Sequence, residues 1–140
     1  MSYINEMSLK FTALSENEAF ARLAVASFCS NKVKELESLS DIKTAVSEAV
    51  TNAIVHGYHG IDKGSVEVNC KINQDEIYIE IIDFGVGIEN INEAQKPFFT
   101  TKPDMERSGM GFTVMESFMD KVIVESTINK GTKVTLLKKI

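Results

Sequence analysis

Residues 48 to 57 combine polar side chains suited to chemistry with a helical hydrophobic pattern. Glu48 and Asn52 are spaced i, i+4, so a helix would place a carboxylate and a carboxamide one turn apart on one side. Two such groups can share one bound ion or nucleophile. We expect them to be half-buried, because they fall on the edge of an apolar stripe with helical spacing. The stripe consists of Ile42, Ala45, Val46, Ala49, Val50, Ala53 and Ile54.

A second candidate segment follows a predicted strand as Asp83-Phe84-Gly85-Val86-Gly87. The two glycines would let the backbone approach a flat or charged ligand closely, and Asp83 could accept a hydrogen bond from an exocyclic amine. A tight turn with a solvated aspartate is the alternative interpretation.

A second pair of glycines, Gly109 and Gly111, opens a predicted helix. Free backbone N–H groups at a helix N-terminus, together with the positive end of the helix dipole, favour a phosphate there. A hinge or an ordinary helix start would show the same residues. Lys102 and Arg107 lie between the two glycine pairs and could neutralise phosphate oxygens, or could be solvated loop charges.

Hydrophobic periodicity predicts three main helices and about five strands, the strands forming mostly antiparallel hairpins. Helices over one face of such a sheet make an α+β two-layer sandwich. Regular patterning is weak from Ile88 to Ser108, apart from a possible short helix at Asn90–Gln95, and this long loop is interpreted as a lid. The predicted strands are Met7–Ala13, Ser65–Asn73, Glu76–Asp83, Lys121–Ser126 and Thr132–Lys138. The first predicted helix follows a capping box at Ser15–Glu18 and ends near Ser30. The second spans Asp41–His56 and the third spans Gly109–Phe118.

Composition limits the class of protein. A chain of 140 residues fits a single domain, residues 1–140, with a core of its own. Cys29 and Cys70 are far apart in sequence and are expected to be buried reduced thiols. A formal net charge of −5 with interleaved signs argues against direct nucleic-acid binding. Without a leader-like or membrane-spanning apolar run, the chain is expected to be cytoplasmic.

Three common nucleotide-binding classes fail on their motifs. The chain has no GxxxxGK[ST] segment, which excludes a P-loop, and Asn90 stands where a Rossmann fingerprint needs its third glycine. Asp83-Phe84-Gly85 imitates a eukaryotic protein-kinase motif, but the chain lacks the H-R-D and A-P-E segments that accompany it.

The order of the segments resembles the GHKL family of ATPases and kinases. A helix with Glu48 and Asn52, then D-x-G-x-G at Asp83, then a lid, then G-x-G at Gly109 match its N, G1 and G2 boxes, and the similarity spans Ile42 to Thr135. The resemblance implies the family's Bergerat fold: a two-layer α/β sandwich whose mixed, mainly antiparallel sheet has helices on one face.

The resemblance also implies roles for single residues. Glu48 would be the general base for a protein hydroxyl, Asn52 would ligate Mg²⁺, and Asp83 would bind the adenine amino group of ATP. Thr132 matches the family's second adenine-side contact, and Lys102 and Arg107 would belong to the lid. The glycines expected to line the nucleotide are Gly85, Gly87, Gly109 and Gly111.

Two further stretches, Pro97–Pro103 and Glu106–Phe112, are similar to the sporulation anti-sigma kinases of this family. That likeness implies a homodimer that binds an RNA polymerase sigma factor and, with Mg·ATP, phosphorylates an anti-anti-sigma factor on serine. Two alternatives remain: an ATP-gated module that sequesters a sigma factor without turnover, and a GHKL ATPase without a protein acceptor.

Overall fold

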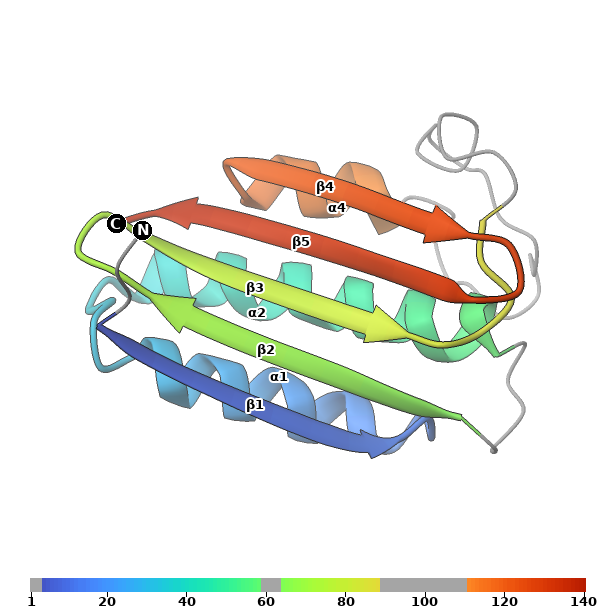
Figure 1. Cartoon of the computed structure of the whole chain (residues 1–140). Helices are drawn as coiled ribbons and strands as arrows, with labels where there is room; N and C mark the ends of the chain where they lie inside the picture. The colour runs from blue at the N-terminus through green and yellow to red at the C-terminus, as the bar shows by residue number, and fades with distance from the viewer. Residues whose placement is uncertain (1–3, 59–63, 89–110) are drawn as a thin grey trace.

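The computed structural model describes residues 4–58, 64–88 and 111–140. The expected lid and the possible helix at Asn90–Gln95 lie outside these residues, apart from Ile88. Figure 1 shows the described elements, which are β1 (Asn5–Thr12), α1 (Asn17–Cys29), α2 (Leu36–Asn52), the π-helical turn η1 (Ala53–Gly57), β2 (Ser65–Ile72), β3 (Glu76–Asp83), α4 (Gly111–Phe118), β4 (Lys121–Thr127) and β5 (Gly131–Lys139).

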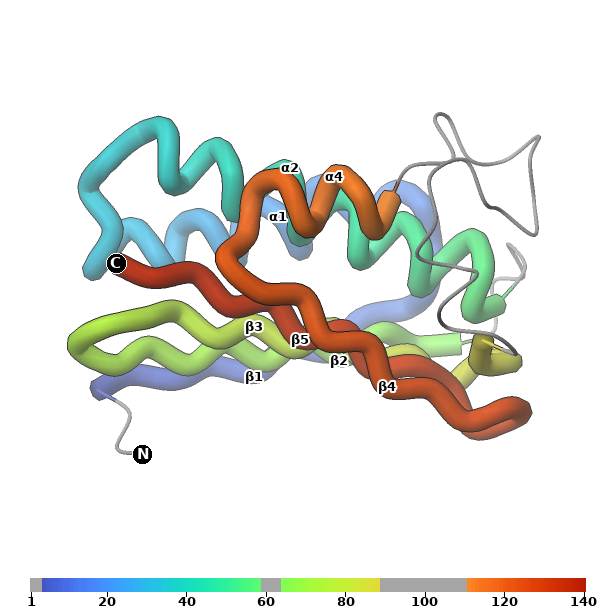
Figure 2. Tube along the Cα trace, turned by 90° about the horizontal axis from the view of Figure 1, so that it is seen from above, coloured from blue at the N-terminus to red at the C-terminus, as the bar shows by residue number. Residues whose placement is uncertain are grey.

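The strands form one sheet in the order β1-β2-β3-β5-β4, and each neighbouring pair is antiparallel. The helices lie together on one face of this sheet (Figure 2). The predicted two-layer sandwich is therefore confirmed. The register sets Asp83, the last residue of β3, opposite Thr132 of β5 and Val66 of β2.

The core lies between the sheet and the helices. Strands β2 and β3 bury every second residue, as their period-two hydrophobic pattern predicts. Helix α2 contributes the stripe recognised in its sequence, and α1 and α4 pack against it. The largest fully buried side chains of the core are Ile42, Ile77, Ile79, Ile81, Met115 and Leu136.

The two cysteines are both free and buried, as predicted. They lie against one another across the interface between α1 and β2. A hydrogen bond with the Cys29 thiol, together with burial, raises the pKa of the Cys70 thiol, so the Cys70 thiol stays protonated and unreactive.

The start of α2 differs from the prediction. The helix begins at Leu36 rather than near Asp41, because the extended residue Glu35 supplies its first carbonyl acceptor, 3.1 Å from the Leu39 nitrogen. The Glu35 carboxylate also accepts a hydrogen bond from Ser38 at 2.7 Å. The first helical residue, Leu36, is 82% exposed and does not extend the buried stripe, so hydrophobic periodicity did not locate the helix start.

The predicted capping box at Ser15–Glu18 is wrong. The residue before α1, Glu16, is already helical and makes no side-chain capping hydrogen bond. The Glu18 nitrogen instead donates to the Ser15 carbonyl at 3.2 Å, so a backbone turn replaces the side-chain cap. The Asn17 side chain donates to the Thr12 carbonyl at 2.9 Å and ties the helix start to the end of β1.

Both predicted hairpins are confirmed, β2–β3 and β4–β5. The Asn73 side chain accepts hydrogen bonds from the backbone nitrogens of Asp75 and Glu76 at 2.8 and 2.9 Å, closing the β2–β3 turn. In the β4–β5 turn, Asn129 takes the left-handed conformation, with φ of 65°. Within the described ranges, no helix is both long and apolar enough to cross a membrane.

Truncating the core beneath the sheet should destabilise the fold. Leu136 is 0% exposed, so Leu136→Ala is expected to lower the free energy of unfolding by about 2–5 kcal/mol through lost burial and a residual cavity. Urea denaturation measures this change. Leu36→Ala is the matched control, because Leu36 is 82% exposed and its loss should change stability by about 0.5 kcal/mol or less. Equal losses in the two variants would contradict this account of the core.

Candidate nucleotide site

Glu48 and Asn52 lie on the last two turns of α2, and both are half-buried at the edge of its apolar stripe. This placement confirms the geometry expected from their spacing. The C-terminal end of α2, which carries these two residues, lies at the end of the sheet where β3 ends and β5 begins (Figure 1).

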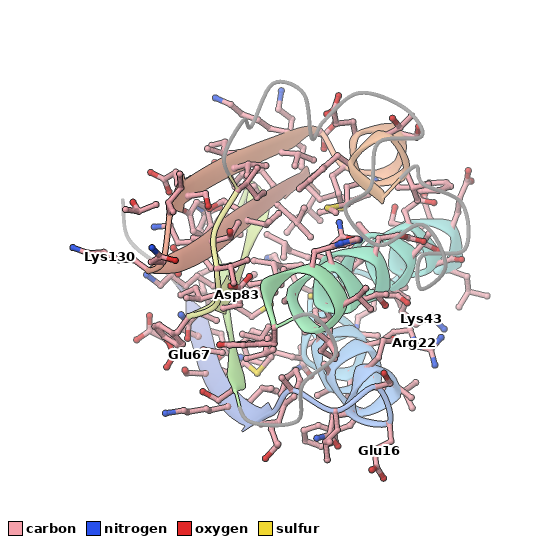
Figure 3. The ribbon with its side chains drawn as sticks, turned by 90° about the vertical axis from the view of Figure 1, so that its right-hand side faces the viewer. Glu16, Arg22, Lys43, Glu67, Asp83 and Lys130 are labelled. Carbon is pink, nitrogen blue, oxygen red and sulfur yellow. The ribbon has the colours of Figure 1, made fainter. Side chains whose placement is uncertain are left out.

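The chain then widens into the π-helical turn η1 before it leaves the helix. Such single wide turns are rare and frequently occur at functional sites. Here the turn brings Gly57 against the side chain of Asp83. A Cβ at Gly57 would lie 2.8 Å from both Cγ and Oδ1 of that carboxylate, so only glycine fits. Figure 3 shows Asp83 beside the C-terminal end of α2.

Asp83 is a buried acid, with 5% of its surface exposed. Its Oδ1 accepts a hydrogen bond from the Gly85 nitrogen at 2.9 Å. Burial raises the pKa of Asp83 to about 6, although backbone hydrogen bonds from Gly85 and Thr132 oppose the shift. Two backbone donors therefore do not fully replace water around this carboxylate, and an added ligand donor would be favourable.

The glycines after Asp83 are required by protein contacts. A Cβ at Gly85 would overlap the carbonyl oxygen of Gly57, which also accepts a hydrogen bond from the Val86 nitrogen at 2.9 Å. Gly87 has φ of +78°, a conformation that side chains disfavour, and lies against the Thr127 carbonyl. The sequence predicted close backbone approaches here. The close approaches seen in the structure are to other backbone segments of the protein. That these glycines line a nucleotide stays a prediction.

Thr132 lies directly across the ladder from Asp83 and is 9% exposed. Its hydroxyl is 2.8 Å from the hydroxyl of Ser126 on β4. The structure thus brings Asp83 and Thr132 together at one end of the sheet, beside the end of α2. Gly111 is buried at the first described residue of α4, which packs against α2. Lys102, Arg107 and Gly109 lie outside the described residues.

Sequence reasoning missed three residues that shape this region: Gly57, Tyr58 and Ser126. Gly57 directly follows the predicted end of the helix at His56, and a glycine at such a helix end beside a candidate site can also mark a close backbone approach. Tyr58 and Ser126 contribute hydroxyls whose partners are distant in sequence, and no local pattern signals such contacts.

The described groups fit a purine with a metal-bound phosphate chain. An acceptor with unmet hydrogen-bonding capacity, Asp83, suits an exocyclic amine. Within the described ranges no three His, Cys, Asp or Glu residues cluster to hold a metal. Mg²⁺ commonly takes only one or two protein oxygens and fills its remaining positions with phosphate and water, which the Glu48–Asn52 pair can accommodate. This end of the fold has the features of a nucleotide site.

Comparison with known proteins defines the class. The profile of the histidine kinase-like ATPase domain matches residues 11–138. The catalytic domain of the histidine kinase ThkA has a TM-score of 0.57 at 14% identity, covering 95% of each chain. The structure of the RsbU and RsbW domains of a Mycobacterium tuberculosis protein has a TM-score of 0.67 at 17% identity, covering 96% of this chain and 31% of that one. These two structures support the fold alone.

Curated relatives narrow the class. The anti-sigma F factor of Clostridium acetobutylicum is 58% identical over 136 residues, covering 96% of this chain and 94% of the relative. The relatives of the same name from Clostridium beijerinckii and Geobacillus thermodenitrificans are 53% and 55% identical, covering 96% and 97% of this chain and 94% and 93% of their own lengths. The chain therefore belongs to the histidine kinase-like ATPase family, as a member of its anti-sigma F factor group.

The buried carboxyl should make stability depend on pH. Because the pKa of Asp83 rises from 3.8 to about 6 on folding, the native state keeps a proton that the unfolded chain has released between these values. The proton on Asp83 contributes fully to the free energy of unfolding below about pH 4, and this contribution is lost as the pH rises through about 6. The loss is roughly 3 kcal/mol at most. Relative to the unmodified chain, Asp83→Asn should therefore gain stability as the pH rises from 4 to 7.

Urea denaturation between pH 4 and 8, without nucleotide, measures this difference. Asp75→Asn, at an exposed position in the β2–β3 turn, is the matched control and should show a constant difference. Parallel pH curves for the unmodified chain and Asp83→Asn would show that the carboxyl is not perturbed by burial.

Proposed function

We propose that this chain is an anti-sigma factor that binds an RNA polymerase sigma factor and uses Mg·ATP to phosphorylate an anti-anti-sigma factor on serine. The observation that carries the proposal is the meeting of Asp83 with the end of the helix that bears Glu48 and Asn52. Relatives that are 53–58% identical over nearly the whole chain and are named anti-sigma F factor support it.

Asp83 and Thr132 bind the adenine in this proposal. The Asp83 carboxylate accepts a hydrogen bond from the 6-amino group, and the Thr132 hydroxyl lies beside it on the neighbouring strand. Support comes from the burial of Asp83, because a buried acceptor with too few donors gains most from a ligand donor. Gly85 and Gly87 keep the loop after Asp83 close to η1 and to the β4–β5 turn, and so hold the wall of the purine site.

Asn52 would hold Mg²⁺ through its side-chain oxygen, and Gly111 at the start of α4 would lie on the phosphate side of the site. Lys102, Arg107 and Gly109 are proposed to complete the phosphate site. Bound ATP supplies the phosphoryl group for transfer.

Glu48 acts as the general base. A serine hydroxyl is a poor nucleophile near neutral pH, so transfer gains from a carboxylate that accepts its proton as the new oxygen–phosphorus bond forms, typically 10²–10⁴-fold. Support for this role is the position of Glu48 one turn before Asn52, on the half-buried edge of α2. There the carboxylate can face both the phosphate end of the site and an incoming protein hydroxyl.

The partners are a sigma factor, an anti-anti-sigma factor and a second copy of the chain. Support for a homodimer comes from α1, where Phe20 and Leu23 are each 56% exposed, beside the edge strand β1. Because sigma factors act in the cytoplasm, the proposal places the chain there.

Replacing the base tests catalysis apart from binding. Glu48→Gln keeps the size of the side chain but cannot accept the proton, so phosphate transfer to an anti-anti-sigma protein should fall by about 10²-fold or more. ATP affinity should change by about threefold or less. Labelled ATP with Mg²⁺ and the purified acceptor measures transfer, and calorimetry measures affinity. Glu37→Gln, exposed in the first turn of the same helix, is the control and should be unchanged.

Unchanged transfer by Glu48→Gln would reject Glu48 as the base. Transfer that is absent from the unmodified chain, with ATP still bound, would favour a sigma-sequestering module without turnover. Release of inorganic phosphate without labelling of the acceptor would favour a simple ATPase.

Removing the metal ligand should weaken the effect of Mg²⁺ on nucleotide binding. We expect Mg²⁺ to strengthen ATP binding to the unmodified chain, and Asn52→Ala to reduce that gain by about tenfold, equivalent to about 1.4 kcal/mol. ATP titrations with Mg²⁺ and with EDTA measure it. An equal Mg²⁺-dependent gain in ATP affinity in both proteins would show that Asn52 does not bind the metal.

A further inference from the structure

Two side-chain hydroxyls hold the two ends of the loop that follows Asp83. The Phe84 nitrogen donates to the Tyr58 hydroxyl at 2.6 Å, and the Ile88 nitrogen donates to the Ser126 hydroxyl at 2.7 Å. Tyr58 directly follows η1, whereas Ser126 lies on β4. The loop is therefore fixed from the helical layer at one end and from the β4–β5 hairpin at the other.

The Tyr58 hydroxyl joins three segments. It accepts from Phe84 and donates its own proton to the Ser65 carbonyl at 2.7 Å, which links the end of η1 to the start of β2 and the end of β3. Burial raises the pKa of Tyr58, and the neighbouring Asp83 charge also raises it, so the hydroxyl keeps the proton that this geometry uses.

Fixing the Phe84 amide also restrains the backbone of Asp83, from which the carboxylate side chain projects. The peptide group between Asp83 and Phe84 is planar, so a hydrogen bond to its nitrogen restricts rotation about the Asp83 backbone. On the β5 side the backbone of Asp83 is also closely packed, because a Cβ at Gly131 would overlap the Asp83 carbonyl oxygen. Tyr58 thus limits the directions in which the Asp83 carboxylate can point.

The Ser126 hydroxyl orients Thr132. It accepts from Ile88 and has a single proton, with two neighbours within hydrogen-bond distance: the Gly131 carbonyl at 3.1 Å and the Thr132 hydroxyl at 2.8 Å. If the proton goes to Gly131, Thr132 donates to Ser126; if it goes to Thr132, that hydroxyl is the acceptor. In either arrangement the Thr132 hydroxyl oxygen stays hydrogen-bonded to Ser126, on the residue that pairs with Asp83 across the ladder.

We propose that Tyr58 and Ser126 are positioning residues of the purine site, and that their hydroxyls set its preference for adenine over guanine. Adenine carries an amine at position 6, where guanine carries a carbonyl. A carboxylate acceptor held rigidly at that position favours the amine and repels the carbonyl, whereas a loosened carboxylate can turn away. The inference rests on the proposed function in taking ATP as the ligand.

Removing each hydroxyl singly tests the proposal. Tyr58→Phe and Ser126→Ala should each weaken ATP binding by about 3- to 10-fold, the usual range for one hydrogen bond, and weaken GTP binding less. The ratio of ATP to GTP affinity should therefore fall. At saturating ATP, kcat for phosphate transfer should stay within about twofold of the value for the unmodified chain. The weaker ATP binding should therefore appear as a higher KM for ATP. Ser126→Thr, which keeps a hydroxyl, should restore the ratio.

Two control variants remove a hydroxyl elsewhere. Tyr78→Phe changes a half-buried tyrosine on β3, and Ser30→Ala removes a hydroxyl that donates to the Ser27 carbonyl at the far end of α1. Both should keep the ATP-to-GTP ratio of the unmodified chain. Calorimetric titration with ATP and with GTP, in the presence of Mg²⁺, gives all these affinities directly.

Amide hydrogen exchange without nucleotide supplies a readout that is independent of activity. Exchange should quicken at Phe84 in Tyr58→Phe and at Ile88 in Ser126→Ala, while the core amides of Ile79 and Ile81 stay protected. An unchanged ATP-to-GTP affinity ratio in both variants, with or without faster exchange, would overturn this inference but not the proposed function. Absence of ATP binding to the unmodified chain would overturn the proposed function and this inference with it.

Discussion

The buried carboxylate of Asp83 is the interaction around which this end of the fold is arranged. Taking a carboxylate out of water costs free energy, and the raised pKa of Asp83 shows that its backbone donors offset only part of that cost. A group in this condition binds strongly to whatever completes its hydrogen bonding. The fold thus keeps a buried, incompletely hydrogen-bonded acceptor at the point where the proposed function requires recognition of an amine.

Close backbone packing keeps that acceptor in place. Gly57 from η1 lies against the carboxylate, and the loop after it is tied back by the hydrogen bond from Val86 to the Gly57 carbonyl. The π-helical turn makes this approach possible, because it ends α2 at Asn52 and carries the chain toward β3. Asp83 and the polar groups of α2 are therefore joined through one short segment.

Much of the fold follows from local sequence. The period-two pattern predicted the bounds of β3 as the structure has them, and Glu48 and Asn52 were expected on the edge of the α2 stripe, where they lie. These features depend on residues a few positions apart. The start of α2 was predicted wrongly, because its first residue is exposed and does not extend the buried stripe. The cap of α1 was predicted wrongly, because a backbone turn replaces the side-chain hydrogen bond.

The remaining site geometry could not be predicted from local patterns. The π-helical turn adds one residue to a helix whose apolar stripe continues through it, so periodicity does not register it. Tyr58 and Ser126 meet partners 26 and 38 residues away along the chain, and those meetings depend on strand register and on how the helices sit over the sheet. Asp83 was singled out by its motif, but its burial and raised pKa needed the neighbouring segments in place.

The most direct test of the account is a crystal structure of the chain with a non-hydrolysable ATP analogue and Mg²⁺. The account predicts the adenine amino group within hydrogen-bond distance of the Asp83 carboxylate, the metal on the Asn52 side-chain oxygen, and the γ-phosphate facing Glu48. A purine bound away from Asp83, or phosphates that leave the end of α2, would contradict it.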